Sequence, residues 1–300
     1  QPPLVFGLLN IHKPTGVTSR DVVNVVARLV RPAKCGHAGT LDPLAEGVLV
    51  VCIGPATRLI ENVQQMPKHY RGEFLLGRES PTEDVEGAVT ELVDPPIPTR
   101  SDLDAAARSL VGTIEQRPPQ FSALKVGGRR AYDVARRGET IDLAPRPVTV
   151  HELAVIEYDY PSVVLDVRCG GGTYIRSLGR DLAAAVGTAA VMSALVRTAI
   201  GPFPVESAIA LADLNADMLP KALLPPTSAL GDMPRHVLSA AELAEVIAGR
   251  FIEIARDASN AAATTGIAAE VAAVDVAGQL RAILVPRGDG RWGPNRVFQT

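Results

Sequence analysis

A glycine-rich segment, Gly36–Gly47, carries the side chains best suited to chemistry in this sequence. It reads GHAGTLDPLAEG and holds two carboxylates, Asp42 and Glu46. Glycines allow a backbone to turn sharply and to approach a ligand closely, and a carboxylate can act as the nucleophile in covalent catalysis. An Asp-Pro pair in such a segment is more often an ordinary turn. The residues alone therefore leave catalysis by Asp42 as the minority interpretation.

Other patterns of catalytic residues are missing from the sequence. The five histidines show no spacing typical of metal ligands. Gly170–Gly172 lacks the lysine and hydroxyl residue that close a phosphate-binding loop, and no serine or cysteine lies in a nucleophile elbow. The three cysteines have the spacing of neither a metal knuckle nor a redox pair, which favours a reducing compartment. We therefore expect no metal site and a cytoplasmic protein.

A basic segment, Arg117–Arg137, is the second feature with a chemical interpretation. It contains six lysines or arginines against one acidic residue, Asp133, and a Gly127-Gly128 pair typical of a β-hairpin. Runs of like charge are usually solvated surfaces. The alternative is a lobe that binds the phosphates of a nucleic acid, because charge of one sign is concentrated over a short stretch.

The composition is that of an ordinary globular protein. A chain of 300 residues predicts about two domains, and 47% hydrophobic residues argue against disorder of the whole chain. The formal net charge of −3 excludes a histone-like polycation, so a nucleic-acid site would have to be concentrated on one face. No apolar run approaches the roughly 20 residues of a membrane span, and the first residues lack the features of a signal peptide.

Strands and helices have to position these segments. Alternating and β-branched runs predict strands at Leu4–Ile11, Val48–Ile53, His69–Gly77, Val148–Tyr158 and Val163–Cys169. Helical periodicity and capping residues predict helices after an N-cap at Ser19 and at Thr57–Met66, Asp102–Val111 and Tyr174–Val186. In the third of these helices, we expect Ala105, Leu110 and Val111 to point inward.

The composition changes near residue 230. Residues 207–278 hold nine acidic and four basic side chains, whereas the last twenty residues hold four arginines and one aspartate. Two further strands are expected at Leu280–Val285 and Arg291–Phe298. We therefore predict a small, β-rich C-terminal domain.

Five motifs, in order along the chain, resemble the TruB family of tRNA pseudouridine synthases. They are HKPTGVTS (residues 12–19), GHAGTLDPLAEGVLVVCIGPATRL (36–59), KHYRGEFLLG (68–77), PPQFSALKVGGRRAYDVARRGE (118–139) and GGGTYIRSLGRDLA (170–183). The resemblance covers about residues 10–205. Long motifs in a fixed order are hard to produce by chance.

The resemblance implies an α+β fold with a mixed, mostly antiparallel sheet and flanking helices. A catalytic domain would span residues 1–229, with an RNA-binding lobe inserted at about 117–147, and a small PUA-like, β-rich domain would span 230–300. The implied activity is isomerisation of uridine to pseudouridine at position 55, in the T loop of tRNA, by base flipping. The implied enzyme is a cytoplasmic monomer that needs no cofactor, guide RNA or membrane.

The resemblance also assigns roles to single residues. Asp42 aligns with the family's nucleophile and would attack either C6 of uracil or C1′ of the ribose. Arg176 matches the arginine that pairs with this aspartate, and Tyr70 matches the tyrosine that stacks on uracil. Leu195 would line the base pocket, and His37 would enter the space that the flipped base leaves. Taken singly, these residues would be interpreted as surface or core residues.

Further residues are candidates for contact with RNA phosphates. In the catalytic domain these are Lys13, Lys125, Arg129, Arg130 and Arg136. In the C-terminal domain, the basic tail Arg281–Arg296 is the expected contact surface.

The sequence departs from the family pattern at two places, and alternatives stay open. Ala194–Arg197 is less basic than the family motif, and Glu83-Asp84 stands in a turn that is usually rich in Thr and Asp. Neither is expected to touch the chemistry, although both could alter contacts with the substrate. The alternatives are a non-enzymatic RNA-binding or tRNA-folding protein, a guide-RNA-dependent relative, and a carboxylate-dependent hydrolase of small molecules. The basic insertion favours the standalone enzyme, because that lobe would grip tRNA directly.

Overall fold

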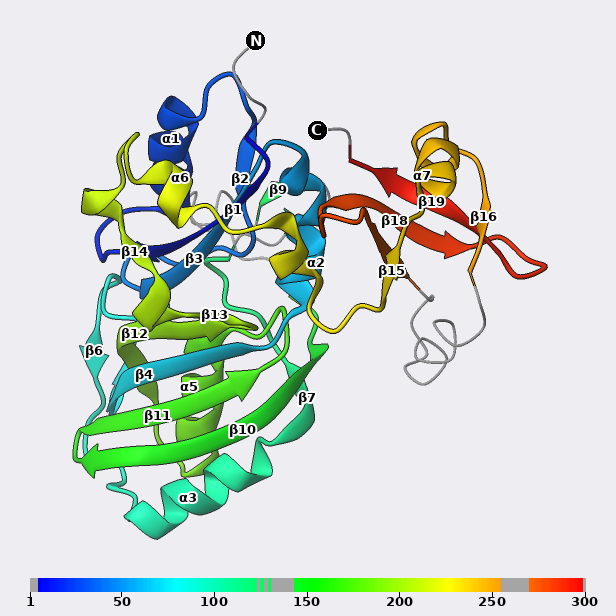
Figure 1. The fold of residues 1–300 in the computed structure, drawn as a ribbon. Coiled ribbons are helices and arrows are strands. Elements are labelled where there is room, and N and C mark those ends of the chain that lie inside the picture. The colour runs from blue at the N-terminus through cyan, green and yellow to red at the C-terminus, as the bar shows by residue number, and fades with distance from the viewer. Residues whose placement is uncertain (1–4, 123–124, 127–128, 131–142, 255–269, 299–300) are drawn as a thin grey trace.

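The computed structural model describes residues 5–122, 125–126, 129–130, 143–254 and 270–298. Its strands form a large mixed sheet and, to one side of it, a smaller five-stranded sheet (Figure 1). Helices cover the large sheet, so the architecture is the α+β fold expected from the sequence.

The large sheet has ten strands among the described residues. Its strand order is β14-β1-β3-β12-β4-β11-β10-β7, with β2 paired to β3 and β13 paired to β12. Neighbours run antiparallel except for the β1–β14 and β3–β12 pairs, which are parallel. In the order of the sheet, with the two side strands last, the bounds are Ile209–Ala210, Gly7–Lys13, Glu46–Ile53, Ala190–Ile200, Lys68–Leu76, Ser162–Cys169, Arg146–Asp159, Gly112–Gln116, Cys35–His37 and Phe203–Pro204.

Strand β3 is buried on both faces, which explains its unbroken apolar sequence. Leu49, Val51 and Ile53 pack against helix α1 (Ser19–Leu29). Val48, Val50 and Cys52 face the opposite way, into a second cluster that includes side chains of the five-stranded sheet. The alternation follows from the two-residue period of a strand. It anchors the C-terminal end of the Gly36–Gly47 loop in the centre of the protein.

Helix α1 begins differently from the prediction. Thr18, not Ser19, is the N-cap: its hydroxyl accepts a hydrogen bond from the amide of Asp21, whose carboxylate accepts one from the amide of Thr18. Ser19 instead points inward, where its hydroxyl donates to the carbonyl of Leu41 and accepts from the Leu41 amide. Ser19, the residue predicted as the N-cap, thus holds the backbone of Leu41, which precedes Asp42.

The predicted inward face of helix α3 (Arg100–Ser109) is wrong. Leu103, Ala106 and Ala107 are buried, whereas Ala105 and Val111 are exposed. The capping box formed by Thr99 and Asp102 starts the helix earlier than predicted and fixes which side chains face the sheet. Of the predicted inward residues, only Leu110 packs against the core.

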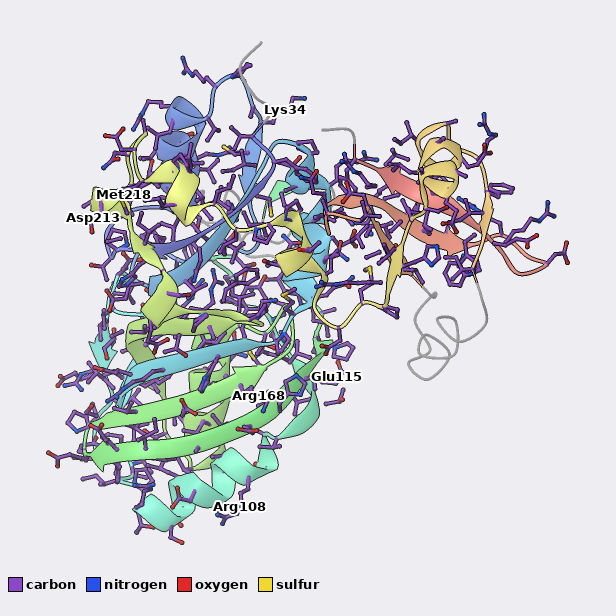
Figure 2. The ribbon with its side chains drawn as sticks, viewed as in Figure 1. Lys34, Arg108, Glu115, Arg168, Asp213 and Met218 are labelled. Atoms are coloured by element: carbon purple, nitrogen blue, oxygen red, sulfur yellow. The ribbon has the colours of Figure 1, made fainter. Side chains whose placement is uncertain are left out.

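Helix α5 (Ile175–Ala185) lies behind β4 and β11 in the view of Figure 1 and approaches the sheet closely. A Cβ atom at Gly179 would lie 2.0 Å from the ring of Phe74 on β4, so only glycine fits there. On the other face of the sheet, Arg168 of β11 points to solvent (Figure 2). Its Nη1 atom lies 2.8 Å from Oε1 of Glu152, an exposed residue of β10. Helix α5 therefore has one fixed distance from the sheet, and its first turn carries Arg176.

Shorter elements complete the main part of the chain. The segment predicted as a helix at Thr57–Met66 is a 3₁₀ turn followed by α2. Strands β8 and β9 pair on either side of residues 127–128, as the hairpin prediction requires. The remaining helical bounds are Gly54–Leu59 (η1), Ile60–Gln65 (α2), Val205–Ser207 (η2), Leu211–Asp213 (η3), Leu219–Ala222 (α6), Pro226–Leu230 (η4) and Ala240–Ile247 (α7). The short strands are Arg78–Glu79 (β5), Thr90–Glu91 (β6), Lys125–Val126 (β8) and Arg129–Arg130 (β9).

The five-stranded sheet has the order β15-β17-β18-β19-β16. Its bounds in that order are Arg235–Val237, Val271–Val274, Leu280–Pro286, Arg291–Val297 and Ile252–Glu253. Both predicted closing strands are confirmed. This sheet has its own core around Trp292 and also shares a core with the large sheet, where Phe6 stacks on Phe298 at 5.5 Å between ring centroids. The boundary at residue 230 stays a prediction.

None of the helices in the described ranges combines the length and the apolar composition needed to cross a membrane.

Candidate active site

The loop that carries Asp42 runs between β2 and β3 and is held from several sides. Besides the bonds from Ser19 to Leu41, the Lys13 ammonium donates to the carbonyls of Pro14 and Val17, at 2.8 Å each, and lies 3.5 Å from the carbonyl of Pro43. The side chain of Asp42 itself stays 37% exposed. The backbone on either side of Asp42 is therefore fixed, while its carboxylate opens towards solvent.

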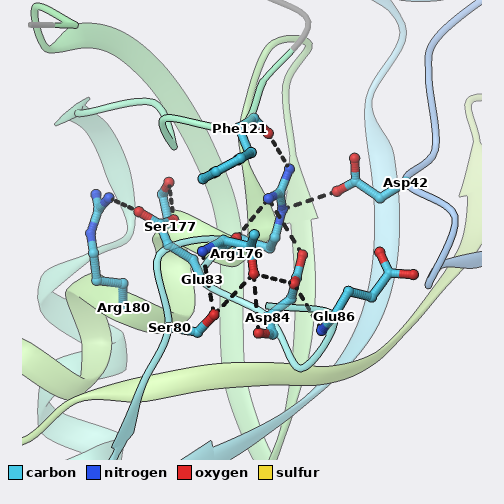
Figure 3. Close-up of polar contacts among 10 residues, drawn as sticks. Asp42, Ser80, Glu83, Asp84, Glu86, Phe121, Arg176, Ser177 and Arg180 are labelled. Atoms are coloured by element: carbon cyan, nitrogen blue, oxygen red, sulfur yellow. Dashed lines mark hydrogen bonds and ion pairs between the residues drawn. The ribbon is translucent and has the colours of Figure 1, made fainter. Parts of the chain in front are cut away.

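Arg176 is the partner of Asp42. Its Nε atom lies 3.0 Å from Asp42 Oδ2, although the arginine side chain is only 6% exposed (Figure 3). The same guanidinium donates to the carbonyls of Thr82 and Phe121, at 2.7 and 3.0 Å, and pairs with Asp84 Oδ2 at 3.4 Å. The donors of the guanidinium are thus directed at four separate groups, so its position is fixed. The geometry is the one expected for this pair from the resemblance.

The expectation that the Glu83-Asp84 segment does not touch the chemistry is wrong. The turn crosses the start of α5, where buried Asp84 pairs with Arg176, and the Glu83 carboxylate accepts from the hydroxyl of Ser177 at 2.8 Å and pairs with Arg180. Burial raises the pKa of Glu83, and the charge of Arg180 opposes that rise. The turn was misjudged because tertiary packing, and not spacing in the sequence, brings it to Arg176.

Glu86 is a further carboxylate beside Asp42 and Asp84. Its backbone amide donates to Asp84 Oδ1 at 3.1 Å, and its side chain projects near Asp42 (Figure 3). Burial raises the pKa of Glu86, and the negative charges of Asp84 and Asp42 raise it further.

Tyr70 and Leu195 lie on the neighbouring strands β4 and β12. Both side chains are nearly buried and belong to one core cluster with Leu41 and Ile175, so they adjoin the loop of Asp42 and the first turn of α5. Burial raises the pKa of Tyr70. The structure thus brings Asp42, Arg176, Tyr70 and Leu195 together, although their roles toward a base remain predictions.

Lys13 is not an RNA contact in this structure. It is fully buried, and its ammonium is directed at the carbonyls of Pro14 and Val17 and, at 3.5 Å, at that of Pro43 beside Asp42. Burial lowers its pKa to about 8, an effect that Asp42 and Glu86 partly offset. The prediction failed because a lysine in a loop motif is normally exposed, whereas here a ring of carbonyls satisfies its ammonium.

The other predicted contacts with the substrate RNA stay predictions. His37 is partly buried on β2, and burial, together with the charges of Arg197 and Arg20, lowers its pKa. Lys125, Arg129 and Arg130 belong to the paired strands β8 and β9. Arg136 lies outside the described residues.

The basic tail of the chain is only partly available as a contact surface. Arg281 pairs with Asp275 at 2.7 Å, and Arg296 makes two contacts of 3.1 Å to Glu270. Both arginines are largely buried in these pairs. The expectation for the tail is therefore wrong for these two residues, because they pair with acidic side chains that stand at the two ends of strand β17.

Sequence reasoning missed Arg197, which lies on β12 on the same face as Leu195. Its side chain is 2% exposed and is directed at the backbone of the Asp42 loop. The sequence does contain an indication of this role. An arginine interrupts an apolar strand at a position where the alternation of the strand predicts an inward side chain, and a charged side chain buried there needs hydrogen-bond partners.

The arrangement supports chemistry by a carboxylate held by a cation. Arg176 holds one carboxylate oxygen of Asp42. The Asp42 side chain is still partly exposed to solvent, so the carboxylate could attack a carbon atom of a substrate. Across the described ranges of the chain, no group of three or more His, Cys, Asp or Glu side chains could hold a metal ion.

Comparisons with known proteins identify the family of the chain. The family model of the TruB family pseudouridylate synthase (N terminal domain) matches residues 27–175. A tRNA pseudouridine synthase B of Bradyrhizobium diazoefficiens is 40% identical over 305 residues, which cover 98% of this chain and 86% of that protein. One of Symbiobacterium thermophilum is 44% identical over 248 residues, 82% of each chain.

Solved structures show the same fold. A Cbf5-Nop10-Gar1 complex contains a chain with 27% identity and a TM-score of 0.70, and the match covers 95% of this chain and 79% of that one. An H/ACA RNP bound to a substrate RNA containing 2′-deoxyuridine has a chain with 24% identity and a TM-score of 0.71, covering 98% and 86%. From the family model and the full-length relatives it follows that the chain belongs to the TruB family of pseudouridylate synthases.

Proposed function

We propose that this protein isomerises uridine to pseudouridine in the T loop of tRNA, at position 55, as a standalone enzyme. The observation that carries the proposal is the ion pair between Asp42 and Arg176, in which a buried guanidinium holds a carboxylate that is still open to a ligand. Relatives that are 40% identical over almost the whole chain are tRNA pseudouridine synthases B, which supports tRNA as the substrate.

The reaction needs one nucleophile and no net oxidation or reduction. Asp42 would attack C6 of the uracil ring or C1′ of the ribose, and both routes lead to cleavage of the N1–C1′ bond. The base then turns, a C5–C1′ bond forms, the proton on C5 is lost and N1 gains a proton. The Asp42 carboxylate is released unchanged, so substrate and product are isomers.

The surrounding residues would prepare the base for this attack. Because the ring carbon atoms of a stacked uridine are covered by its neighbours, the base must flip out to reach the Asp42 carboxylate. Tyr70 would stack on it, Leu195 would line its pocket, and His37 would enter the space that it leaves. Arg176 would hold Asp42 charged and oriented for the attack.

We also propose that the inserted segment, about residues 117–147, grips the tRNA. Lys125, Arg129, Arg130 and Arg136 supply positive charge there, as contacts to RNA phosphates require. The proposal includes a monomer with a catalytic domain over residues 1–229 and a PUA-like domain over 230–300. The related H/ACA complex is a ribonucleoprotein, so dependence on a guide RNA is the alternative to test.

Tritium release from a tRNA transcript labelled at uracil C5 tests the function. Wild type and Asp42→Asn would be compared with no other macromolecule present. We expect release by the wild type alone, with the affinity of Asp42→Asn for tRNA nearly unchanged. No release by the wild type, with tRNA binding intact, would favour a binding protein or a guide-dependent enzyme. Equal loss of tRNA binding in Asp42→Asn would contradict its role as a nucleophile.

A further inference from the structure

Arg197 lies in β12 with its side chain directed at the loop of Asp42. Its Nε donates to the carbonyl of Val48 at 2.8 Å, its Nη1 to that of Thr40 at 3.3 Å and its Nη2 to that of Gly39 at 3.1 Å. Gly39 and Thr40 precede Asp42, and Val48 follows the loop. One planar group therefore ties the two ends of the catalytic loop together.

The backbone of Arg197 grips the loop as well. Arg197 is the register partner of Gly47 where β12 runs parallel to β3. Gly47 has a φ of +103°, and a Cβ atom at this position would lie 2.3 Å from the carbonyl oxygen of Arg197. The chain can approach Arg197 so closely only because residue 47 is glycine.

Arg197 is unusual among buried arginines because, within the described ranges, no acidic side chain pairs with its guanidinium. Among the described residues, the ion pairs of the site involve Arg176 and Arg180, and no carboxylate lies within 4.0 Å of the Arg197 guanidinium. Burying an ionised group without a counter-charge is unfavourable, and an apolar side chain could fill the space. What an apolar side chain cannot supply is a rigid fork of donors that binds three carbonyls at once.

Arg197 also adjoins Tyr70. The two residues are register partners in the antiparallel pair β12–β4. The positive charge of Arg197 lowers the pKa of Tyr70, against the larger effect of burial. Arg197 is therefore the point at which the loop of Asp42 and the strand of Tyr70 are fixed relative to each other.

We propose that Arg197 is a positioning residue for the isomerisation: its guanidinium sets the loop of Asp42 relative to Tyr70 at the geometry needed for attack on the flipped base. This inference rests on the proposed function. It assigns Arg197 no contact with the substrate, so it predicts an effect on the chemical step and not on tRNA binding. A displacement of about 1 Å at a reacting group can slow a reaction about 10²-fold.

Three variants test the proposal: Arg197→Met, Arg197→Lys and the control Leu284→Ala. Methionine fills the space without donors or charge, and lysine keeps the charge and donors but not the fork. Leu284 is fully buried in the core of the five-stranded sheet, so its side chain is no part of the surface expected to contact RNA, and its truncation lowers stability away from the loop. The measurements are the single-turnover rate of tritium release with enzyme in excess, the Kd for tRNA, and the folded fraction at the assay temperature.

We expect the single-turnover rate of Arg197→Met to fall about 10²-fold, and that of Arg197→Lys about tenfold. The Kd for tRNA should change less than about threefold in both, and Leu284→Ala should keep the wild-type rate once corrected for folded protein. A rate of Arg197→Met equal to that of Leu284→Ala would overturn the proposal, as would a parallel loss of rate and affinity. If Arg197→Met does not fold, a wild-type rate in Arg197→Lys would overturn it. An inactive wild type would instead refute the proposed function.

Discussion

Arginine side chains meet aspartates both at the catalytic loop and in the five-stranded sheet, but the two aspartates are used differently. In the sheet, Asp275 is 11% exposed: one oxygen pairs with Arg281 and the other accepts from the amides of Ala277 and Gln279, at 2.9 Å each. These bonds, led by that from Gln279, lower the pKa of Asp275 despite some burial. At the loop, Asp42 is 37% exposed, and the ion pair with Arg176 engages only its Oδ2.

This difference in the exposure and bonding of the aspartate distinguishes the structural pair Asp275–Arg281 from the pair Asp42–Arg176, which is suited to chemistry. All the bonding capacity of Asp275 is directed at its own hairpin, so the pair stabilises the turn between β17 and β18. At the loop the arginine is the fully engaged partner, and the carboxylate keeps an exposed part. A nucleophile has to be held without being saturated, and the loop pair meets both conditions.

The largest effect is expected from matched lysine substitutions of the two arginines. Arg176→Lys should slow turnover about 10³-fold, because a lysine cannot contact Asp42, Asp84 and two carbonyls at once. Arg281→Lys should leave turnover unchanged and lower only stability. Steady-state tritium release, with tRNA affinity measured in parallel, tests both. Equal losses of turnover in Arg176→Lys and Arg281→Lys would contradict the distinction between a catalytic and a structural arginine–aspartate pair.

A smaller effect is expected from neutralising Asp84, the second aspartate of Arg176, and Asp275, the aspartate of Arg281. Asp84→Asn should lower turnover about tenfold to 10²-fold, because Arg176 then loses one of the groups that fix its orientation. Asp275→Asn should leave turnover at the wild-type value while lowering the free energy of unfolding, since breaking a hydrogen bond to a charged group costs about 1.5–3 kcal/mol. Single-turnover rates and urea unfolding of both variants provide the test. Wild-type turnover in Asp84→Asn would show that the charge of Asp84 is not needed to orient Arg176.

The same comparison explains which parts of the molecule were predictable. Strand β3, the hairpin β10–β11 (Val148–Tyr158 and Val163–Cys169 in the prediction) and helix α5 have strong periodic patterns, and the structure contains them at nearly the predicted positions. The pairing of Asp42 with Arg176 was expected only from the resemblance, since the two residues are far apart in the sequence. Local pattern and family motif together were sufficient for these elements.

The buried cations could not be predicted in the same way. Lysine and arginine are usually exposed, but backbone carbonyls satisfy both buried cations. Lys13 donates mainly to the carbonyls of Pro14 and Val17, which follow β1, and Arg197 donates to those of Gly39 and Thr40 in the loop of Asp42. Those carbonyls point inward only in the folded chain. Asp84 was missed for the same reason, because packing of its turn on α5 creates its contact with Arg176.

The smallest effect concerns the pH dependence of stability, through Lys13. Burial lowers the pKa of this lysine from 10.5 to about 8. Between pH 8 and 10.5 the unfolded chain therefore holds a proton that the folded chain has lost, so the contribution of Lys13 to the free energy of unfolding increases with pH, by at most about 1.4 kcal/mol per unit. Urea unfolding of wild type and Lys13→Met across this range measures it.

The wild type has to be compared with Lys13→Met, because other titrating groups lower the free energy of unfolding as the pH rises. Burial raises the pKa values of Cys52 and Cys169 to about 12 and 11, so these thiols reduce stability as the pH rises above 9. They are present in both proteins and cancel in the difference, which should grow in favour of the wild type from pH 8 to 10.5. Parallel pH curves would mean that Lys13 is solvated. In that case Lys13→Met should also reduce the salt dependence of tRNA binding, as Arg129→Glu is expected to do; a buried Lys13 leaves that dependence unchanged.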